Sequence, residues 1–300
     1  MSSRAEPRPR LRDVSQDVPA QELTEAHPAG TIFACDFYVT GAEQGEPVTA
    51  GFRLGRILNV DHHAPVPHME RHVSSTTLAL AHSAEGGELP GAGDAVVINH
   101  TDCDSVLSSA LLLGLLPASS RLDDAAIAAD HTGAEDPLAD ALQAVDELRD
   151  YELSLSVARA VLAGHPVPEP AQEHLRRRER ARKLAESLAR NAQVEGGVAL
   201  IVSDEVTDGE FFPRYLPDAE VLVIACPHPD DAARRAMKLR LGTVAGTPPL
   251  HRLAMASFDR AYGGRWNAGS NKRGGGCTMD PEAYAAEVRR LLARARSAAS

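Results

Sequence analysis

The sequence has few aromatic residues and few cysteines, and it contains no long hydrophobic run. Aromatic residues make up 4% of the chain, so the core must consist mostly of Ala, Leu and Val, which favours helices and sheets over a β-sandwich. The four cysteines form no Cys-x-x-Cys pair, which argues against a zinc ribbon and is typical of a reducing cytosol. Because no apolar run reaches the roughly 18 residues that span a bilayer, we expect a cytoplasmic protein without a membrane segment.

An excess of positive charge is also missing, and this limits the partners that the protein can bind. The formal net charge is −11 and the isoelectric point is near 5.5. Long duplex nucleic acid is therefore not an expected partner, whereas a local basic pocket for a small phosphorylated substrate is compatible with this charge. The 300 residues suffice for one large domain or two ordinary ones, and a homodimer stays open.

In the first half, apolar segments that end on polar residues alternate with helical patterns. This alternation predicts an α/β domain with a parallel sheet, whose ligand site lies beyond the carboxyl ends of the strands. We expect strands over 31–36, over part of 51–60 and over 93–100. We expect helices over 74–84 and 104–116, one or two helices within 137–164, and a short helix or strand over 122–133.

The second half predicts a smaller α/β domain that follows a long charged helix over 171–193. Its expected strands cover 196–204, 219–226 and 236–244, and its expected helices cover 248–262 and 281–296. The expected domain boundaries are a disordered tail over 1–29, a metal-binding domain over 30–165, a helical linker over 166–194 and a substrate-binding domain over 195–300.

Carboxylate and imidazole side chains gather at the ends of the predicted elements in the first half. The candidate metal ligands are Asp36, Asp61, His62, His63, His100, Asp102, Asp104, Asp130 and His131. So many carboxylates at one sheet edge would repel one another without a cation. The mixed set suits two divalent ions, Mn²⁺ before Zn²⁺, Fe²⁺ or Mg²⁺, which can share a bridging carboxylate and activate a water.

The stretch "HTDCDS" has two interpretations. Its His100, Asp102 and Asp104 alternate, so an extended segment would present all three on one side. Alternatively, the two aspartates only cap the following helix.

These motifs resemble the DHH phosphoesterase superfamily. "VDHH" (60–63) resembles its triplet, and "NHTDCDSVLSSALLLG" (99–114) resembles its strand end with two aspartates. Members include exonucleases related to RecJ, oligoribonucleases, cyclic-dinucleotide phosphodiesterases and family II inorganic pyrophosphatases. On this resemblance Asp36 matches the lone aspartate and Asp130 the later one, which implies a metal-dependent phosphohydrolase.

The motif order departs from that of the family, because the double-aspartate segment follows the triplet here. We therefore expect a permuted connection that places the strand over 93–100 beside the triplet strand. His62 and His63 are the catalytic candidates: one is a metal ligand, and the other orients it or acts as a general acid.

The glycine-rich segment "YGGRWNAGSNKRGGG" (262–276) is either a flexible surface loop or an anion-binding loop, and its cations favour the second. It resembles the family's phosphate-binding Gly-Gly-Gly-His motif without the histidine. "KLRLG" (238–242) resembles the arginine-bearing strand before that motif. The expected substrate-binding residues are Arg240, Gly263, Gly264, Arg265, Asn267, Ser270, Lys272 and Arg273.

Two other functions compete with a phosphohydrolase of small nucleotides, short oligonucleotides or related phosphate esters. His228, Asp230 and Asp231 in "CPHPDDAARR" resemble the motif of zinc-dependent deacetylases related to LmbE, although a turn initiated by Pro229 explains the same residues. The second competing function is that of a nucleotide-binding protein with no catalytic activity.

Overall fold

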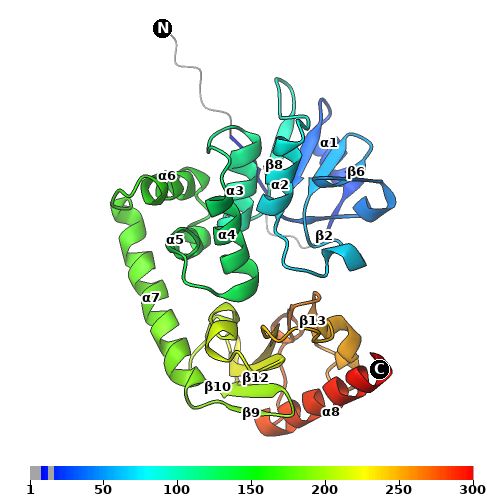
Figure 1. Ribbon diagram of the computed structural model, residues 1–300, viewed down its shortest axis with the longest axis vertical. Coiled ribbons are helices and arrows are strands. Elements are labelled where there is room, and N and C mark those ends of the chain that lie inside the picture. Colours follow the sequence, from blue (N-terminus) through cyan, green and yellow to red (C-terminus); the bar gives the residue numbers. More distant parts are fainter. Residues whose placement is uncertain (1–7, 13–16, 300) are drawn as a thin grey trace. The chain divides into compact units, whose positions relative to one another are not determined.

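A computed structural model describes residues 8–12 and 17–299, which form two compact units (Figure 1). The first unit extends to Asp130 and also includes Glu135–Arg178. The second contains His131–Ala134 and the chain from Glu179 onward. The division falls inside the long helix α7 (Glu169–Ala189), whose last turns pack on the second unit.

The first unit is built on a six-stranded sheet with the order β1–β8–β3–β7–β6–β5. The parallel strands are β1 (Arg10–Leu11), β8 (Ala95–Ile98), β3 (Ile32–Cys35) and β7 (Ile57–Val60). The antiparallel strands β6 (Gly51–Leu54) and β5 (Glu46–Val48) complete the sheet. Every residue of β3, β7 and β8 is buried, as expected for strands covered on both faces. The prediction of an α/β fold with a parallel sheet is confirmed.

Helices α2 and α3 pack against this sheet, and α4, α5 and α6 pack around α3 (Figure 1). The five helices are α2 (Ser75–Ala84), α3 (Cys103–Leu112), α4 (Ser120–Ile127), α5 (Pro137–Val145) and α6 (Tyr151–Leu162). A π-helical turn at Ala128–Thr132 follows α4, and a 3₁₀ turn at Asp146–Leu148 follows α5. Ser74 caps α2 with a reciprocal capping box, and Asp102 caps α3 through the N–H of Ser105.

Strand β3 lies between β8 and β7, so the strand over 93–100 is not the direct neighbour of the triplet strand that we expected. All three strands are parallel, and their carboxyl ends therefore meet at the same edge of the sheet. Within 51–60, where we expected one strand over part of the segment, a turn at Gly55 produces the antiparallel pair β6–β7.

The prediction of disorder over 1–29 is wrong for the residues of this range that form regular structure. Strand β2 (Asp17–Pro19) pairs with β4 (Tyr38–Thr40), and helix α1 (Ala20–Ala26) follows it. Val18 and Leu23 are buried, so these two apolar side chains anchor the segment to the core. Residues 1–7 and 13–16 of the predicted tail lie outside the described residues.

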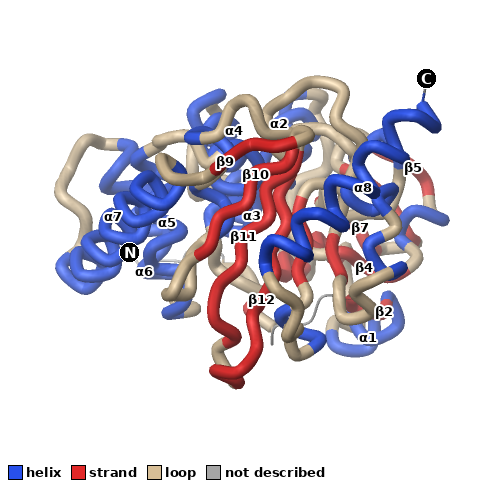
Figure 2. Tube along the Cα trace, turned by 90° about the horizontal axis from the view of Figure 1, so that it is seen from below, coloured by secondary structure: helices blue, strands red, loops and turns tan. Residues whose placement is uncertain are grey.

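The second unit contains a six-stranded sheet with the order β13–β14–β12–β11–β10–β9. Its strands are β9 (Gln193–Glu195), β10 (Val198–Val202), β11 (Val221–His228), β12 (Asp231–Leu241), β13 (Gly263–Gly264) and β14 (Ala268–Ser270). Helix α8 (Pro281–Ala299) packs on one face (Figure 2), where Tyr284 and Val288 join the core. Phe211 and Phe212 cover the other face.

The predicted helix over 248–262 is wrong. The chain instead forms two short 3₁₀ turns, Leu250–Leu253 and Met255–Ser257. Ala254 between them has a φ of 51°, a left-handed conformation that interrupts a helix. The apolar pattern is explained by single buried side chains such as Leu250 and Met255.

No helix within the described ranges is both long enough and apolar enough to cross a lipid bilayer.

We predict that Asn59→Ala lowers the free energy of unfolding by about 2–4 kcal/mol, because it unpairs several buried backbone groups. The Asn59 side chain accepts from the N–H of Val39 and donates to the carbonyls of Ala34 and Phe37, at 3.0, 3.2 and 2.9 Å. Urea denaturation measures the loss. The exposed Asn191→Ala is the control, and equal stability of the two variants would contradict the prediction.

Candidate metal centre

Asp36 lies directly after β3 in a backbone conformation that is uncommon for a residue with a side chain. Its φ is 59°, a strained value that aspartate tolerates better than most residues. Its N–H donates to the carbonyl of Val60 on β7. Ser75 and Ser105 donate hydroxyl hydrogen bonds of 3.0 and 2.8 Å to its two carboxylate oxygens. The carboxylate is therefore buried but fixed in orientation.

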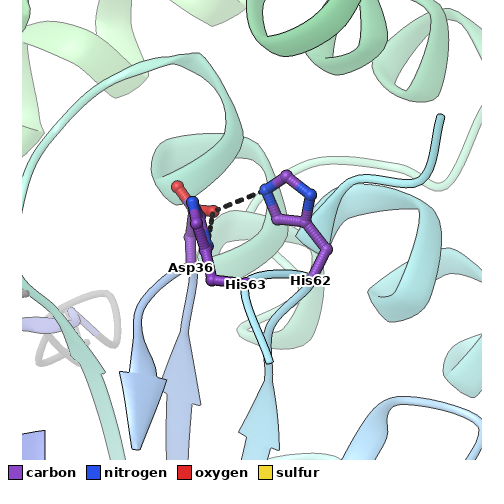
Figure 3. Close-up of side chains that lie close together, drawn as sticks. All are labelled: Asp36, His62 and His63. Carbon is purple, nitrogen blue, oxygen red and sulfur yellow. Dashed lines mark ion pairs between the residues drawn. The ribbon is translucent and has the colours of Figure 1, made fainter. Parts of the chain in front are cut away.

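One oxygen of Asp36 belongs to a first group of candidate ligands. The Nε2 atom of His62 lies 3.0 Å from Asp130 Oδ2 and 3.7 Å from Asp36 Oδ1. It also lies 3.7 Å from Asp104 Oδ2. Ligand atoms of all four residues lie within 4.8 Å of one another, close enough to hold a metal ion. Figure 3 shows the rings of His62 and His63 near the Asp36 carboxylate.

The other oxygen of Asp36 belongs to a second group, formed with His100 and Asp102. The Nδ1 atom of His100 lies 3.8 Å from Asp36 Oδ2 and 3.1 Å from Asp102 Oδ1. The geometry therefore offers two adjacent sets of imidazole and carboxylate donors that share Asp36, and His63 forms a further candidate group with Asp36 and His62. Such a donor set fits two divalent transition-metal ions with a bridging carboxylate.

Neither interpretation of "HTDCDS" describes the whole segment, because Asp104 lies within α3 and not in an extended segment, and only Asp102 caps the following helix. Asp102 caps its own helix, α3. Asp104 accepts from the first backbone N–H groups of α2, those of Ser75 at 2.6 Å and Thr76 at 2.7 Å. The positive end of the α2 dipole thus orients a carboxylate that also faces His62.

Asp61 was predicted as a metal ligand, and its carboxylate forms its contacts with His63. It accepts from the His63 backbone N–H at 2.9 Å and lies 2.6 Å from Nδ1 of the same ring. Asp61 is absent from the candidate metal groups found among the described residues. Burial disfavours its charge, but His63 outweighs burial and holds the pKa of Asp61 below its usual range.

The charged side chains of the two groups shift one another's pKa values. Burial and then the neighbouring carboxylate of Asp104 raise the pKa of Asp36, and burial and Asp130 raise the pKa of Asp104. Burial alone would lower the pKa of His100, but Asp102 beside it raises that pKa to about 9. A bound cation would relieve the repulsion between the carboxylates.

Several residues that support the site were not predicted from the sequence. They are Ser75, Thr76 and Ser105, which hydrogen-bond to candidate ligands, and Thr101 and Asp146, which hydrogen-bond to each other beside His100 and Asp102. The hydroxyl-rich start of α2, "SSTT", carried a signal that could have identified the first two. Asp146 carried none, since it lies 45 residues from its partner Thr101.

In the second unit, the end of the glycine-rich segment lines a cavity of about 530 Å³. The lining residues are His228, Asp230, Asp231, Arg234, Lys272, Arg273, Gly274 and Gly275. Of the eight expected substrate-binding residues, Lys272 and Arg273 are in this lining. Gly263 and Gly264 instead form the edge strand β13, and Arg240 lies on β12.

The loop beside this cavity is braced by hydrogen bonds. Asn271 accepts from the N–H of Met237 at 2.8 Å and donates to Asp259 at 2.9 Å. The buried hydroxyl of Tyr284 donates to the same Asp259 oxygen at 2.7 Å. These bonds argue against a flexible surface loop at the position of Lys272 and Arg273.

The deacetylase interpretation conflicts with the contacts of His228. Its Nδ1 accepts from the N–H of Asp230 at 3.2 Å, and its Nε2 donates to the carbonyl of Lys272 at 2.8 Å. Both ring nitrogens are therefore occupied. The motif is a turn between two strands, β11 and β12, and it contributes to no candidate metal group among the described residues.

We predict that the affinity for Mn²⁺ rises between about pH 6 and pH 8, because metal binding must displace protons. His100 is protonated below its pKa of about 9, and the raised pKa values of Asp36 and Asp104 favour their protonated forms. Titration calorimetry in buffers with different ionisation enthalpies counts the protons released. An affinity independent of pH, with no proton release, would contradict this description of the site.

Comparison with known proteins gives weak similarities. No protein-family model and no curated protein sequence matches the chain. Among solved structures, it is similar to the pGpG-specific phosphodiesterase PggH of Vibrio cholerae, with 11% identity, a TM-score of 0.43, and coverage of 72% of this chain and 88% of that one. It is also similar to manganese-bound RecJ of Thermus thermophilus, with 17% identity and a TM-score of 0.44. That match covers 93% of this chain and 45% of RecJ.

A third similar structure is an exopolyphosphatase-related protein of Bacteroides fragilis, with 16% identity and a TM-score of 0.40. The match covers 93% of this chain and 76% of that one. At these identities and TM-scores, the similarities support no conclusion about activity. The site itself therefore has to support the functional assignment.

Proposed function

We propose that the protein is a metal-dependent phosphohydrolase that cleaves a phosphoester or phosphoanhydride bond of a small phosphorylated substrate. The observation that supports this most directly is the buried carboxylate of Asp36, whose two oxygens face two separate sets of donors. Aspartates at this density, with histidines among them, are typical of sites that bind two divalent ions. The motif resemblance to the DHH phosphoesterases points to the same chemistry.

In this proposal, the chain holds two divalent ions, most readily Mn²⁺, through donors contributed by the ends of several elements. The ligands of one ion are Asp36, His62, Asp104 and Asp130, and those of the other are Asp36, His100 and Asp102. Two ions of this kind supply an activated water and neutralise the charge on phosphate oxygens. Ser75 and Ser105 keep the shared carboxylate of Asp36 turned toward both sets.

The two histidines of the triplet have different environments, and we assign them different roles. The His62 side chain is buried, at 1% exposure, and its Nε2 faces three carboxylates, so we assign it as a ligand. The His63 side chain is 29% exposed, and Asp61 accepts from its Nδ1. Asp61 thereby fixes the ring of His63, and we assign its Nε2 as the atom that delivers a proton to the leaving group.

The cavity of the second unit is the proposed anchor for a phosphate or another anionic part of the substrate. Lys272 and Arg273 supply positive charge, and Gly274 and Gly275 let the backbone approach a ligand closely. The volume of about 530 Å³ is in the range of small-molecule sites. Together with the acidic net charge, this favours a mononucleotide, dinucleotide, short oligonucleotide or related phosphate ester over long nucleic acid.

The test of the proposed reaction is a panel of phosphomonoesters, phosphodiesters and phosphoanhydrides assayed with Mn²⁺. We expect turnover of at least one class by the wild type and none by Asp102→Ala/Asp104→Ala, while the exposed Asp218→Ala keeps full activity. Stoichiometric nucleotide binding without turnover would favour the non-catalytic alternative. A wild type that binds no metal and cleaves no member of the panel would refute the proposal.

We expect His63→Ala to lower kcat by about 100-fold or more, since it removes the proton donor. Asp61→Asn should lower kcat by about 10-fold to 100-fold, because the ring loses its orienting partner. Both variants should retain the metal content of the wild type by elemental analysis. Loss of metal from His63→Ala would show that His63 is a ligand and not the acid.

We expect Lys272→Ala/Arg273→Ala to raise KM by about 10-fold or more with little change in kcat, because charge-assisted contacts to the substrate are lost away from the reacting bond. The control is Lys183→Ala/Arg294→Ala, which removes the same charge from exposed positions. Steady-state kinetics on the best substrate of the panel measures both pairs. An unchanged KM in the first pair would exclude the cavity as the anchor.

A further inference from the structure

The turn between α5 and α6 holds the connection between β8 and α3, which carries His100 and Asp102. The N–H of Thr101, the residue between these two ligands, donates to Asp146 Oδ1 at 2.9 Å. The Thr101 hydroxyl lies 3.1 Å from the Asp146 carbonyl oxygen and 3.3 Å from its Oδ1. Thr101 is fully buried, so without Asp146 its N–H would lack this partner.

The same turn holds the residue that precedes His100. Arg149, at the end of the 3₁₀ turn, donates from Nη1 to the carbonyl of Asn99 at 2.9 Å and from Nη2 to the carbonyl of Arg12. Its backbone has a φ of 51°, and its N–H donates to the Asp146 carbonyl. The segment 99–101 is thus fixed on both sides of His100 by one short turn.

The other candidate ligands are positioned by different contacts. Asp104 is held by the N-terminus of α2, and Asp36 is held by two serine hydroxyls. The Asp146 carboxylate instead accepts hydrogen bonds from Thr101. The negative charge of Asp102 also acts on Asp146: burial, and then the carboxylate of Asp102, raise the pKa of Asp146. The hydrogen bonds of Asp146 thus hold the segment that carries His100 and Asp102.

We propose that Asp146 is a positioning residue that sets the geometry of the His100–Asp102 half of the metal site, through its hydrogen bond to the backbone of Thr101. The proposal rests on the proposed two-metal function. It predicts an asymmetric effect: loss of the Asp146 carboxylate weakens one metal position and spares the position formed with His62. Residues that orient metal ligands in this way typically change metal affinity by about 10-fold to 100-fold.

The test compares Asp146→Ala with Asp146→Asn by Mn²⁺ titration calorimetry and by elemental analysis after dialysis. We expect Asp146→Ala to weaken one of the two binding events by about 10-fold to 100-fold and to leave the other within about two-fold. Asp146→Asn keeps an oxygen that can accept from the Thr101 N–H, so it should retain most of the lost affinity. Asp150→Ala, at the N-cap of α6, is the control for general loosening of this region.

Thermal melting of the metal-free variants separates positioning from loss of the fold. If Asp146→Ala melts far below the wild type, it is replaced in the comparison by Asp146→Asn and Thr101→Ser. Both of these variants keep the contact to the backbone of residue 101. The proposal then requires that both bind two ions as the wild type does. Two unchanged binding events in Asp146→Ala, an equal loss of both, or an Asn variant as defective as the Ala variant would overturn the proposal. A wild type that binds no metal would refute the proposed function instead.

Discussion

The structure of the first unit depends on one electrostatic constraint, which is the burial of the Asp36 carboxylate among other carboxylates. Burial raises the pKa of this group, and neighbouring aspartates raise it further. A carboxylate in such a position is stable only when it is hydrogen-bonded, protonated or paired with a cation. Two serine hydroxyls supply the hydrogen bonds, and the imidazoles of His62 and His100 flank the two oxygens. The arrangement is therefore costly as protein alone and favourable around metal ions.

The parallel sheet makes this arrangement possible. Strands β8, β3 and β7 are neighbours with their carboxyl ends at one edge, so the residues that follow them converge although they are far apart in the chain. Helices α2 and α3 begin at the same edge, and their N-terminal amide groups stabilise Asp104 and Asp102. The order in which the strands occur in the chain does not matter for this geometry. The same side chains can therefore converge at this edge from segments in a different order along the chain.

The sequence predicted the sheet and every member of the two candidate ligand groups, because the ends of elements can be recognised from apolar runs that stop at Asp or His. It did not predict the role of Asp61, since a choice between a metal ion and the adjacent His63 depends on side-chain geometry. Asp146 was missed because its contact with Thr101 exists only in the tertiary structure. The helix expected over 248–262 failed because an apolar pattern cannot distinguish buried single turns from a continuous helix. The cavity beside Lys272 likewise depends on the β11–β12 turn, which the sequence did not place next to the glycine-rich loop.

The central claim is that Asp36 is shared between two metal ions. Electron paramagnetic resonance of the Mn²⁺-loaded protein tests it most directly, because two ions that share a bridging carboxylate are magnetically coupled. The account predicts two ions per chain with a coupled spectrum, and loss of that coupling in Asp36→Asn. A single ion per chain, or two ions with the spectrum of isolated Mn²⁺, would contradict it.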